Sequence, residues 1–141
     1  MSSTSELRLR CPAQSHYVAS IRHALAAFLQ VLEVDRDFLE DVTTAAGEAL
    51  ANAVEHAYTR QQNGDAGYLQ LRARVLPGGK LAVDVSDEGA FIHREALPGR
   101  GFGLRIIRAV AGKLTIDTSG GTCVRMTFNG FARQIAKSAE R

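Results

Sequence analysis

The order of its helical and strand-like segments constrains the fold of this 141-residue chain more than any other feature. Alternating apolar residues predict a short strand over residues 7–11, ended by Pro12. Apolar residues then recur at helical spacing over residues 15–32 and again over residues 37–58. Asp37, with Glu40 three residues later, predicts the start of the second helix. Two helices therefore follow the first strand, and no strand is predicted between them.

The second half of the chain predicts two hairpins separated by a loop and a third helix. Two strands are predicted over residues 69–75 and 80–86, joined by a turn at Pro77-Gly78-Gly79. Two more are predicted over residues 114–118 and 123–128, joined by a turn at Ser119-Gly120-Gly121. A third helix is expected over residues 102–110. The whole order favours a two-layer α/β (α+β) sandwich, in which three helices cover one face of a mixed, mostly antiparallel sheet. We expect one domain over residues 1–141, with a core at 7–128 and a tail at 130–141.

Composition excludes several classes of protein. Hydrophobic residues make up 45% of the chain, which is enough for a packed core. The net charge is +2, and no run of lysine and arginine forms a basic face, so direct nucleic-acid binding is not expected. The chain shows neither a signal-peptide pattern nor an apolar run long enough to cross a membrane, so we expect a cytoplasmic protein.

The two cysteines carry no metal-site signal. Cys11 and Cys123 are far apart, lack a C-x-x-C pattern and lie in strand-like apolar segments. Buried free thiols are the preferred interpretation, and a disulfide between them is the alternative.

Three polar side chains share one face of the second helix. Glu48, Asn52 and His56 are spaced by four residues, so they lie one helical turn apart. A carboxylate in such a row can deprotonate a hydroxyl group, and a neighbouring amide oxygen can help to hold Mg²⁺. The alternative is an ordinary solvated face of an amphipathic helix.

The segment V-D-V-S-D-E-G places a carboxylate at the end of a predicted strand. Asp87 could accept a hydrogen bond there from an exocyclic amine, and Gly89 would let the backbone approach a flat ring closely. The alternative is a common Asp-Glu-Gly turn at a strand end.

Glycines alternate immediately before the third predicted helix. The sequence is Gly99-Arg100-Gly101-Phe102-Gly103-Leu104, and it would expose backbone N–H groups at a helix N-terminus, where phosphate oxygens bind. The spacing is neither that of a dinucleotide-binding fingerprint nor that of a P-loop. A loop without a ligand is the alternative interpretation.

Taken together, these patterns resemble the GHKL superfamily of ATPases, which has the histidine-kinase-like or Bergerat fold. The three motifs look like the N-box, G1 and G2 motifs of that superfamily, in the same order. Gly121-Thr122 looks like its final Gly-Thr motif. The resemblance covers residues 7–128 and implies that the chain binds ATP with Mg²⁺.

The length and the E-A-x-x-N-x-x-x-H motif resemble the anti-sigma factor serine/threonine kinases in particular. Such proteins phosphorylate a serine on a small STAS-type anti-sigma antagonist and sequester a sigma factor. The resemblance implies the same partners here, and it makes a homodimer plausible.

The resemblance also implies a role for each motif residue. Glu48 would be the catalytic base, Asn52 would hold Mg²⁺, Asp87 would bind adenine and Thr122 would support the adenine site. Residues 99–104 would wrap the phosphates, as the glycine-rich segment above suggests. His56 would have a structural role beside the nucleotide, whereas Arg22 is either a partner contact or a plain surface arginine.

The chain departs from the family pattern at two places. Phe91 stands where the G1 motif often has a second glycine, and the stretch from Asp87 to Gly101 is short. These departures motivate an alternative function, a non-catalytic module that senses nucleotide and switches a partner protein.

Overall fold

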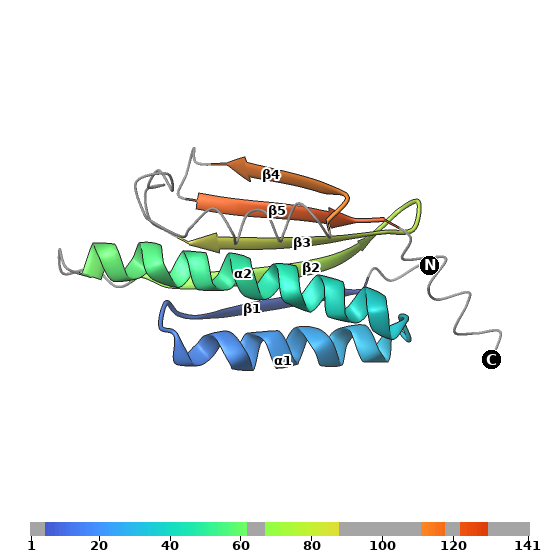
Figure 1. The fold of residues 1–141 in the computed structure, drawn as a ribbon, viewed down its shortest axis with the longest axis horizontal. Helices are drawn as coiled ribbons and strands as arrows, with labels where there is room; N and C mark the ends of the chain where they lie inside the picture. Colours follow the sequence, from blue (N-terminus) through green and yellow to red (C-terminus); the bar gives the residue numbers. More distant parts are fainter. Residues whose placement is uncertain (1–4, 62–66, 88–110, 118–121, 130–141) are drawn as a thin grey trace.

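The fold is described from a computed structural model, which describes residues 5–61, 67–87, 111–117 and 122–129 (Figure 1). The expected third helix at 102–110 lies outside these residues, as do the tail from residue 130 and the tip of the second hairpin. Seven elements are described, and they follow the expected order. They are β1 (Glu6–Pro12), α1 (His16–Val31), α2 (Arg36–Gln61), β2 (Tyr68–Leu76), β3 (Lys80–Asp87), β4 (Lys113–Asp117) and β5 (Thr122–Phe128).

The strands form one five-stranded sheet in the order β1-β2-β3-β5-β4. Every pairing among the described strands is antiparallel, so the expected mixed sheet is wrong for this part of the chain. The reason lies in the connections. β2 and β3 are joined by a tight turn. Between β1 and β2 the chain reverses three times, into α1, into α2 and into β2, and this odd number of reversals makes the two strands antiparallel (Figure 1). The expected two-layer α+β arrangement is confirmed, with two helices described on one face instead of three.

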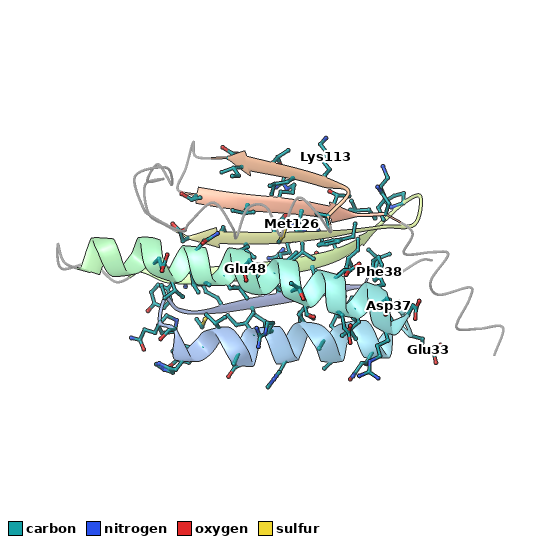
Figure 2. The ribbon with its side chains drawn as sticks, viewed as in Figure 1. Glu33, Asp37, Phe38, Glu48, Lys113 and Met126 are labelled. Carbon is teal, nitrogen blue, oxygen red and sulfur yellow. The ribbon has the colours of Figure 1, made fainter. Side chains whose placement is uncertain are left out.

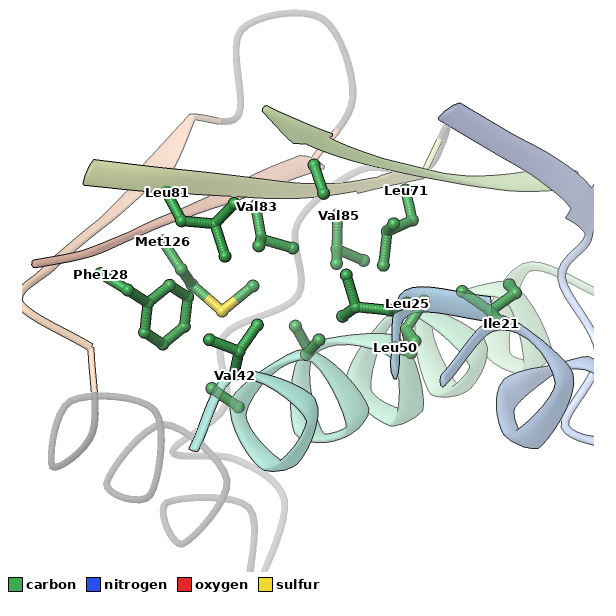
Figure 3. Packing of buried hydrophobic residues seen from close by; sticks show 14 of the residues in the cluster. Ile21, Leu25, Val42, Leu50, Leu71, Leu81, Val83, Val85, Met126 and Phe128 are labelled. Carbon is green, nitrogen blue, oxygen red and sulfur yellow. The ribbon is translucent and has the colours of Figure 1, made fainter. Parts of the chain in front are cut away.

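The core lies between the sheet and the two helices, because alternate strand residues face the helix layer. Figure 3 shows this packing, in which Ile21 and Leu25 of α1 and Val42 and Leu50 of α2 approach the sheet. The side chains that meet them from the strands are Leu71, Leu81, Val83, Val85, Met126 and Phe128. Phe38 contacts Phe128 edge to face, with ring centroids 6.3 Å apart. The start of α2 is therefore anchored on the last strand.

The turn between the helices sets where α2 begins. Glu33 adopts a left-handed backbone conformation with φ of 59°, and the helix starts at Arg36. Asp37 consequently lies in the first turn of the helix. The sequence had suggested that Asp37 is the N-cap, and this prediction is wrong. The negative charge of Asp37 is still favourable there, because the helix N-terminus carries a partial positive charge. Glu40 pairs with Arg36 at 3.3 Å instead of closing a capping box.

The tight turn between β2 and β3 is the expected Pro-Gly-Gly hairpin. Leu76 and Lys80 are the last cross-strand partners, and the turn between them contains Gly78 and Gly79. Their φ angles are 83° and 73°, values that residues with a Cβ rarely adopt. The glycine signal in the sequence therefore has a direct backbone cause.

Both cysteines are free thiols, and both are half-buried instead of fully buried as expected. Cys11 packs against the core, whereas Cys123 lies on the opposite face of the sheet, across from Ser86. Burial raises the pKa of each thiol, and the carboxylate of Asp84 raises that of Cys123 further. In the part of the chain that the structure describes, no helix is both long and apolar enough to span a membrane.

Candidate functional site

A buried carboxylate and a buried hydroxyl group meet at one end of the sheet. Asp87 is the last residue of β3 and Thr122 is the first residue of β5, and the two are direct cross-strand partners. Asp87 is 6% exposed and Thr122 is 3% exposed. Because Val83 and Val85 face the helices, Asp87 continues the same side of its strand and also faces the helix layer.

Burying a carboxylate is costly unless polar groups surround it, so Asp87 needs polar partners at this strand end. A carboxylate oxygen accepts hydrogen bonds, and a threonine hydroxyl both donates and accepts them. Asp87 and Thr122 can therefore bind the edge of a small polar ring. The sheet register brings together these two residues, which the sequence assigned to separate motifs.

The polar row on α2 faces partly inward. Glu48 and Asn52 are both half-buried, and the neighbouring Ala49 and Ala53 are buried. Small alanines let a helix lie close to a sheet, and α2 packs against β2 and β3. Glu48 lies midway along this helix (Figure 2). A fully solvated polar face, the alternative interpretation of this pattern, does not fit the burial of these two side chains.

The end of α2 that carries Asn52 lies at the same end of the molecule as the end of β3 and the start of β5 (Figure 1). Asn52 is thus on the helix segment that leads toward Asp87 and Thr122. The side chain of His56, one turn further, lies outside the described side chains. Its role remains a prediction.

The side chain of Arg22 lies across α2 beside this polar row. Arg22 is exposed on α1, and a Cβ built on Gly47 would lie 2.9 Å from its Cδ atom. Gly47 directly precedes Glu48, so the arginine passes over the helix turn that carries the carboxylate. Sequence reasoning missed Gly47, although a glycine inside a helix costs about 0.5–1 kcal/mol relative to alanine and is a signal of close packing.

The remaining predicted site residues lie outside the described part of the chain. They are Gly89, Gly99, Arg100, Gly101, Phe102, Gly103 and Leu104, together with Phe91. Their roles toward the phosphates stay predictions. Within the described residues, no three His, Cys, Asp or Glu side chains are grouped to hold a metal ion. The amide oxygen of Asn52 is of the ligand type that Mg²⁺ prefers, and its role toward a metal ion stays a prediction.

The fold is an α+β sandwich in which helices cover one face of an antiparallel sheet, with a buried polar pair where β3 ends and β5 begins. The chain matches the histidine kinase-like ATPase domain over residues 11–128. It belongs to this family.

The chain is also similar over nearly its full length to a curated kinase. It is 26% identical over 151 aligned positions to the serine-protein kinase RsbW of Staphylococcus aureus strain JH9, covering 96% of this chain and 93% of the relative. This similarity is distant and full-length.

Two solved structures share the fold. The structure of the RsbU and RsbW domains of Rv1364c from Mycobacterium tuberculosis superposes with a TM-score of 0.70 at 23% identity. That match covers 89% of this chain and 32% of the larger protein. The SiaB–SiaC complex of Pseudomonas aeruginosa matches with a TM-score of 0.64 at 16% identity, covering 86% of this chain and 88% of the other.

Proposed function

We propose that this protein is an ATP-dependent serine/threonine kinase of the anti-sigma factor type, which transfers phosphate to a serine on a small STAS-type antagonist. The observation that carries the proposal is the buried pair of Asp87 and Thr122 at one end of the sheet. The half of α2 that carries Asn52 runs toward the same end (Figure 1). Family membership and the full-length similarity to RsbW support it.

The residues present suit a magnesium–ATP complex by their chemistry. Asp87 would accept a hydrogen bond from the adenine amino group, and Thr122, its partner on the neighbouring strand, would support that contact. Asn52 offers an amide oxygen, a hard ligand that Mg²⁺ accepts. The glycine-rich segment at 99–104 wraps the phosphates in this proposal, with Gly89 close to the base and His56 beside the nucleotide.

Glu48 is the proposed catalytic base. Its half-buried carboxylate lies one helical turn before Asn52, so a base and a metal ligand are fixed on one rigid helix. The carboxylate would accept the proton of the attacking serine hydroxyl as the new O–P bond to the γ-phosphorus forms. The bond from that phosphorus to the β–γ bridging oxygen would break, and ADP would leave with this oxygen. Phosphoryl transfer otherwise depends on positioning and on neutralising charge, which the metal ion supplies when it is bound.

The proposed partners follow from the relatives. RsbW is a serine-protein kinase, and the SiaB–SiaC structure is that of a protein complex, which supports a protein partner for this chain. We propose a STAS-type antagonist as the phosphate acceptor and a sigma factor as the sequestered partner. Arg22, exposed on α1, is the proposed partner contact, and a homodimer remains part of the proposal.

The test is phosphate transfer from labelled ATP to a purified STAS-type protein of the same organism. We expect transfer by the wild type and at least a hundredfold slower transfer by Glu48→Gln, because removal of a general base costs about 10²–10⁴ in rate. Glu40→Gln is the matched control, since Glu40 is an exposed residue of the same helix, and it should transfer at the wild-type rate.

The same assay separates the alternative, a nucleotide sensor without catalysis. If the protein is such a sensor, neither the wild type nor Glu48→Gln transfers label, and both regulate the partner equally. The absence of transfer by folded, nucleotide-bound wild type would overturn the kinase proposal.

A further inference from the structure

The sheet gathers arginines from three strands, β1, β2 and β5, onto the face that α1 and α2 leave uncovered. Because side chains alternate along each strand, the residues that do not face the core all lie on this side. The arginines there are Arg8, Arg10, Arg72, Arg74 and Arg125. We call this surface the arginine face. No run of basic residues in the sequence reveals it, because the arginines are brought together only by the strand register.

One row of cross-strand partners crosses most of the arginine face. Arg8 is opposite Arg72, Arg72 is opposite Asp84, and Asp84 is opposite Arg125. Arg8 and Arg125 are therefore about 14 Å apart, or three strand spacings. A ligand of this row must be extended, so a single small anion would meet only part of it.

Two carboxylates hold four of these guanidinium groups in place. Glu6 accepts hydrogen bonds from Arg72 at 3.0 and 3.2 Å and pairs with Arg8 at 3.1 Å. Asp84 accepts a hydrogen bond from Arg125 at 3.1 Å, and Arg74 lies 3.8 Å from it. Each carboxylate thus serves two arginines, and positive charge remains in excess while the guanidinium groups are already ordered.

The excess extends to the ends of the strands. Lys80 and Lys113 lie on the same side of the sheet. Asp117 also lies there and adds a third acidic residue to Glu6 and Asp84. The whole chain carries a net charge of only +2, so basic charge is concentrated on this side of the sheet. Arg8 and Arg72 are directly opposed like charges, and Glu6 offsets their repulsion by pairing with both.

The arginine face also has the composition of a protein interface. Tyr68 is 45% exposed, and the guanidinium of Arg10 lies 4.3 Å from its ring centroid. Arginine and tyrosine are enriched at the centres of protein interfaces. The side chains of Arg8 and Arg125 are more than half exposed, at 57% and 56%, so a partner can reach both ends of the row.

We propose that the arginine face is a docking surface for a protein partner that presents an acidic surface. Glu6, Asp84 and Asp117 are interspersed among the basic groups, which disfavours a phosphate backbone of uniform negative charge and suits a mixed but acidic protein surface. A second copy of this chain would bring two faces of the same sign together. The inference is independent of the proposed kinase activity, because it uses the opposite side of the sheet.

The test measures binding of a fluorescent decaglutamate peptide by anisotropy at low salt. We expect binding that weakens with added salt, and about threefold to tenfold weaker binding for Arg8→Gln and for Arg125→Gln. Arg36→Gln is the matched control, since Arg36 is an exposed arginine of α2 on the helix side and loses the same charge. It should bind like the wild type. Two separate test variants keep the experiment informative if one of them fails to fold.

Three results would overturn the proposal. Equal weakening by Arg36→Gln would show that only net charge matters. Tighter binding of a single-stranded decathymidylate, lost in Arg8→Gln and Arg125→Gln, would assign the face to nucleic acid. Self-association in sedimentation velocity that both of these variants abolish would assign it to a second copy. Backbone amide shifts confined to β1, β2, β3 and β5 on adding the peptide would support the proposal.

Discussion

The side chain of Arg22 on α1 lies directly over Gly47 of α2, so closely that a Cβ on Gly47 would be 2.9 Å from the arginine Cδ. This contact joins the proposed partner-binding residue to the helix turn that carries Glu48. A partner that draws Arg22 toward itself would therefore also change the packing beside the proposed catalytic base.

We predict that Gly47→Ala shifts Arg22 and that the two residues are energetically coupled. Alanine gains about 0.5–1 kcal/mol of helix propensity, but its Cβ would press on the Arg22 side chain. The gain should therefore be larger in an Arg22→Ala background, by about 0.5–1 kcal/mol, because the obstacle has been removed. Urea denaturation of the four proteins in this double-mutant cycle measures the coupling. Additive effects would show that the contact carries no energy.

The packing of the core predicts that alanine substitutions at two aliphatic residues change the free energy of unfolding by very different amounts. Leu50 is fully buried between α2 and the sheet, whereas Val31 at the end of α1 is 80% exposed. Leu50→Ala should lower the free energy of unfolding by about 2–5 kcal/mol, since it removes buried methyl groups and leaves a cavity. Val31→Ala should change it by less than about 0.5 kcal/mol. Chemical denaturation tests both, and similar effects would contradict the described packing.

Much of the fold was predictable from the sequence because its periodicities are regular. The strand over Leu69 and Leu71 and the turn at Gly78 were identified from alternation and turn chemistry, and the structure confirms them. The start of α2 was misplaced, since Asp37 resembles an N-cap and the backbone of Glu33 that sets the true start leaves no sequence signal.

The site was predictable only where it follows from position along one element. The spacing of Glu48 and Asn52 fixes their helix face, and Asp87 ends an apolar strand. By contrast, the Arg22–Gly47 contact depends on how two helices pack, and the arginine face depends on strand register. Neither kind of relationship is contained in local spacing.

Thr122 tests whether the buried hydroxyl group contributes to nucleotide binding. Thr122→Val keeps the shape of this 3% exposed side chain and removes its hydroxyl group. We expect about tenfold weaker ATP binding, the equivalent of one hydrogen bond, while Thr122→Ser stays near the wild type. Isothermal titration calorimetry measures both affinities. Wild-type affinity in the valine variant would remove Thr122 from the proposed site.

Cys123 gives a prediction for pH. Burial and the Asp84 carboxylate raise the pKa of its thiol above the ordinary value of 9.0, so the folded protein holds this proton more tightly than the unfolded chain does. The resulting stabilisation is complete below pH 9.0 and is lost as the pH rises through the higher folded pKa. In a Cys11→Ser variant, iodoacetamide should therefore react more slowly at pH 8 with the folded protein than with the urea-unfolded protein. Equal rates would contradict the raised pKa.

The central claim is that Asp87 binds an adenine nucleotide, and a thermal-shift titration with Mg²⁺ and ATP tests it most directly. At an ATP concentration of about 100 times Kd, binding should stabilise the wild type by about 2.7 kcal/mol and raise its Tm by several degrees. Asp41→Asn, a matched change at an exposed position of α2, should show the same rise. Asp87→Asn should show little or none. An equal rise in Asp87→Asn, or no rise in the wild type, would contradict the claim.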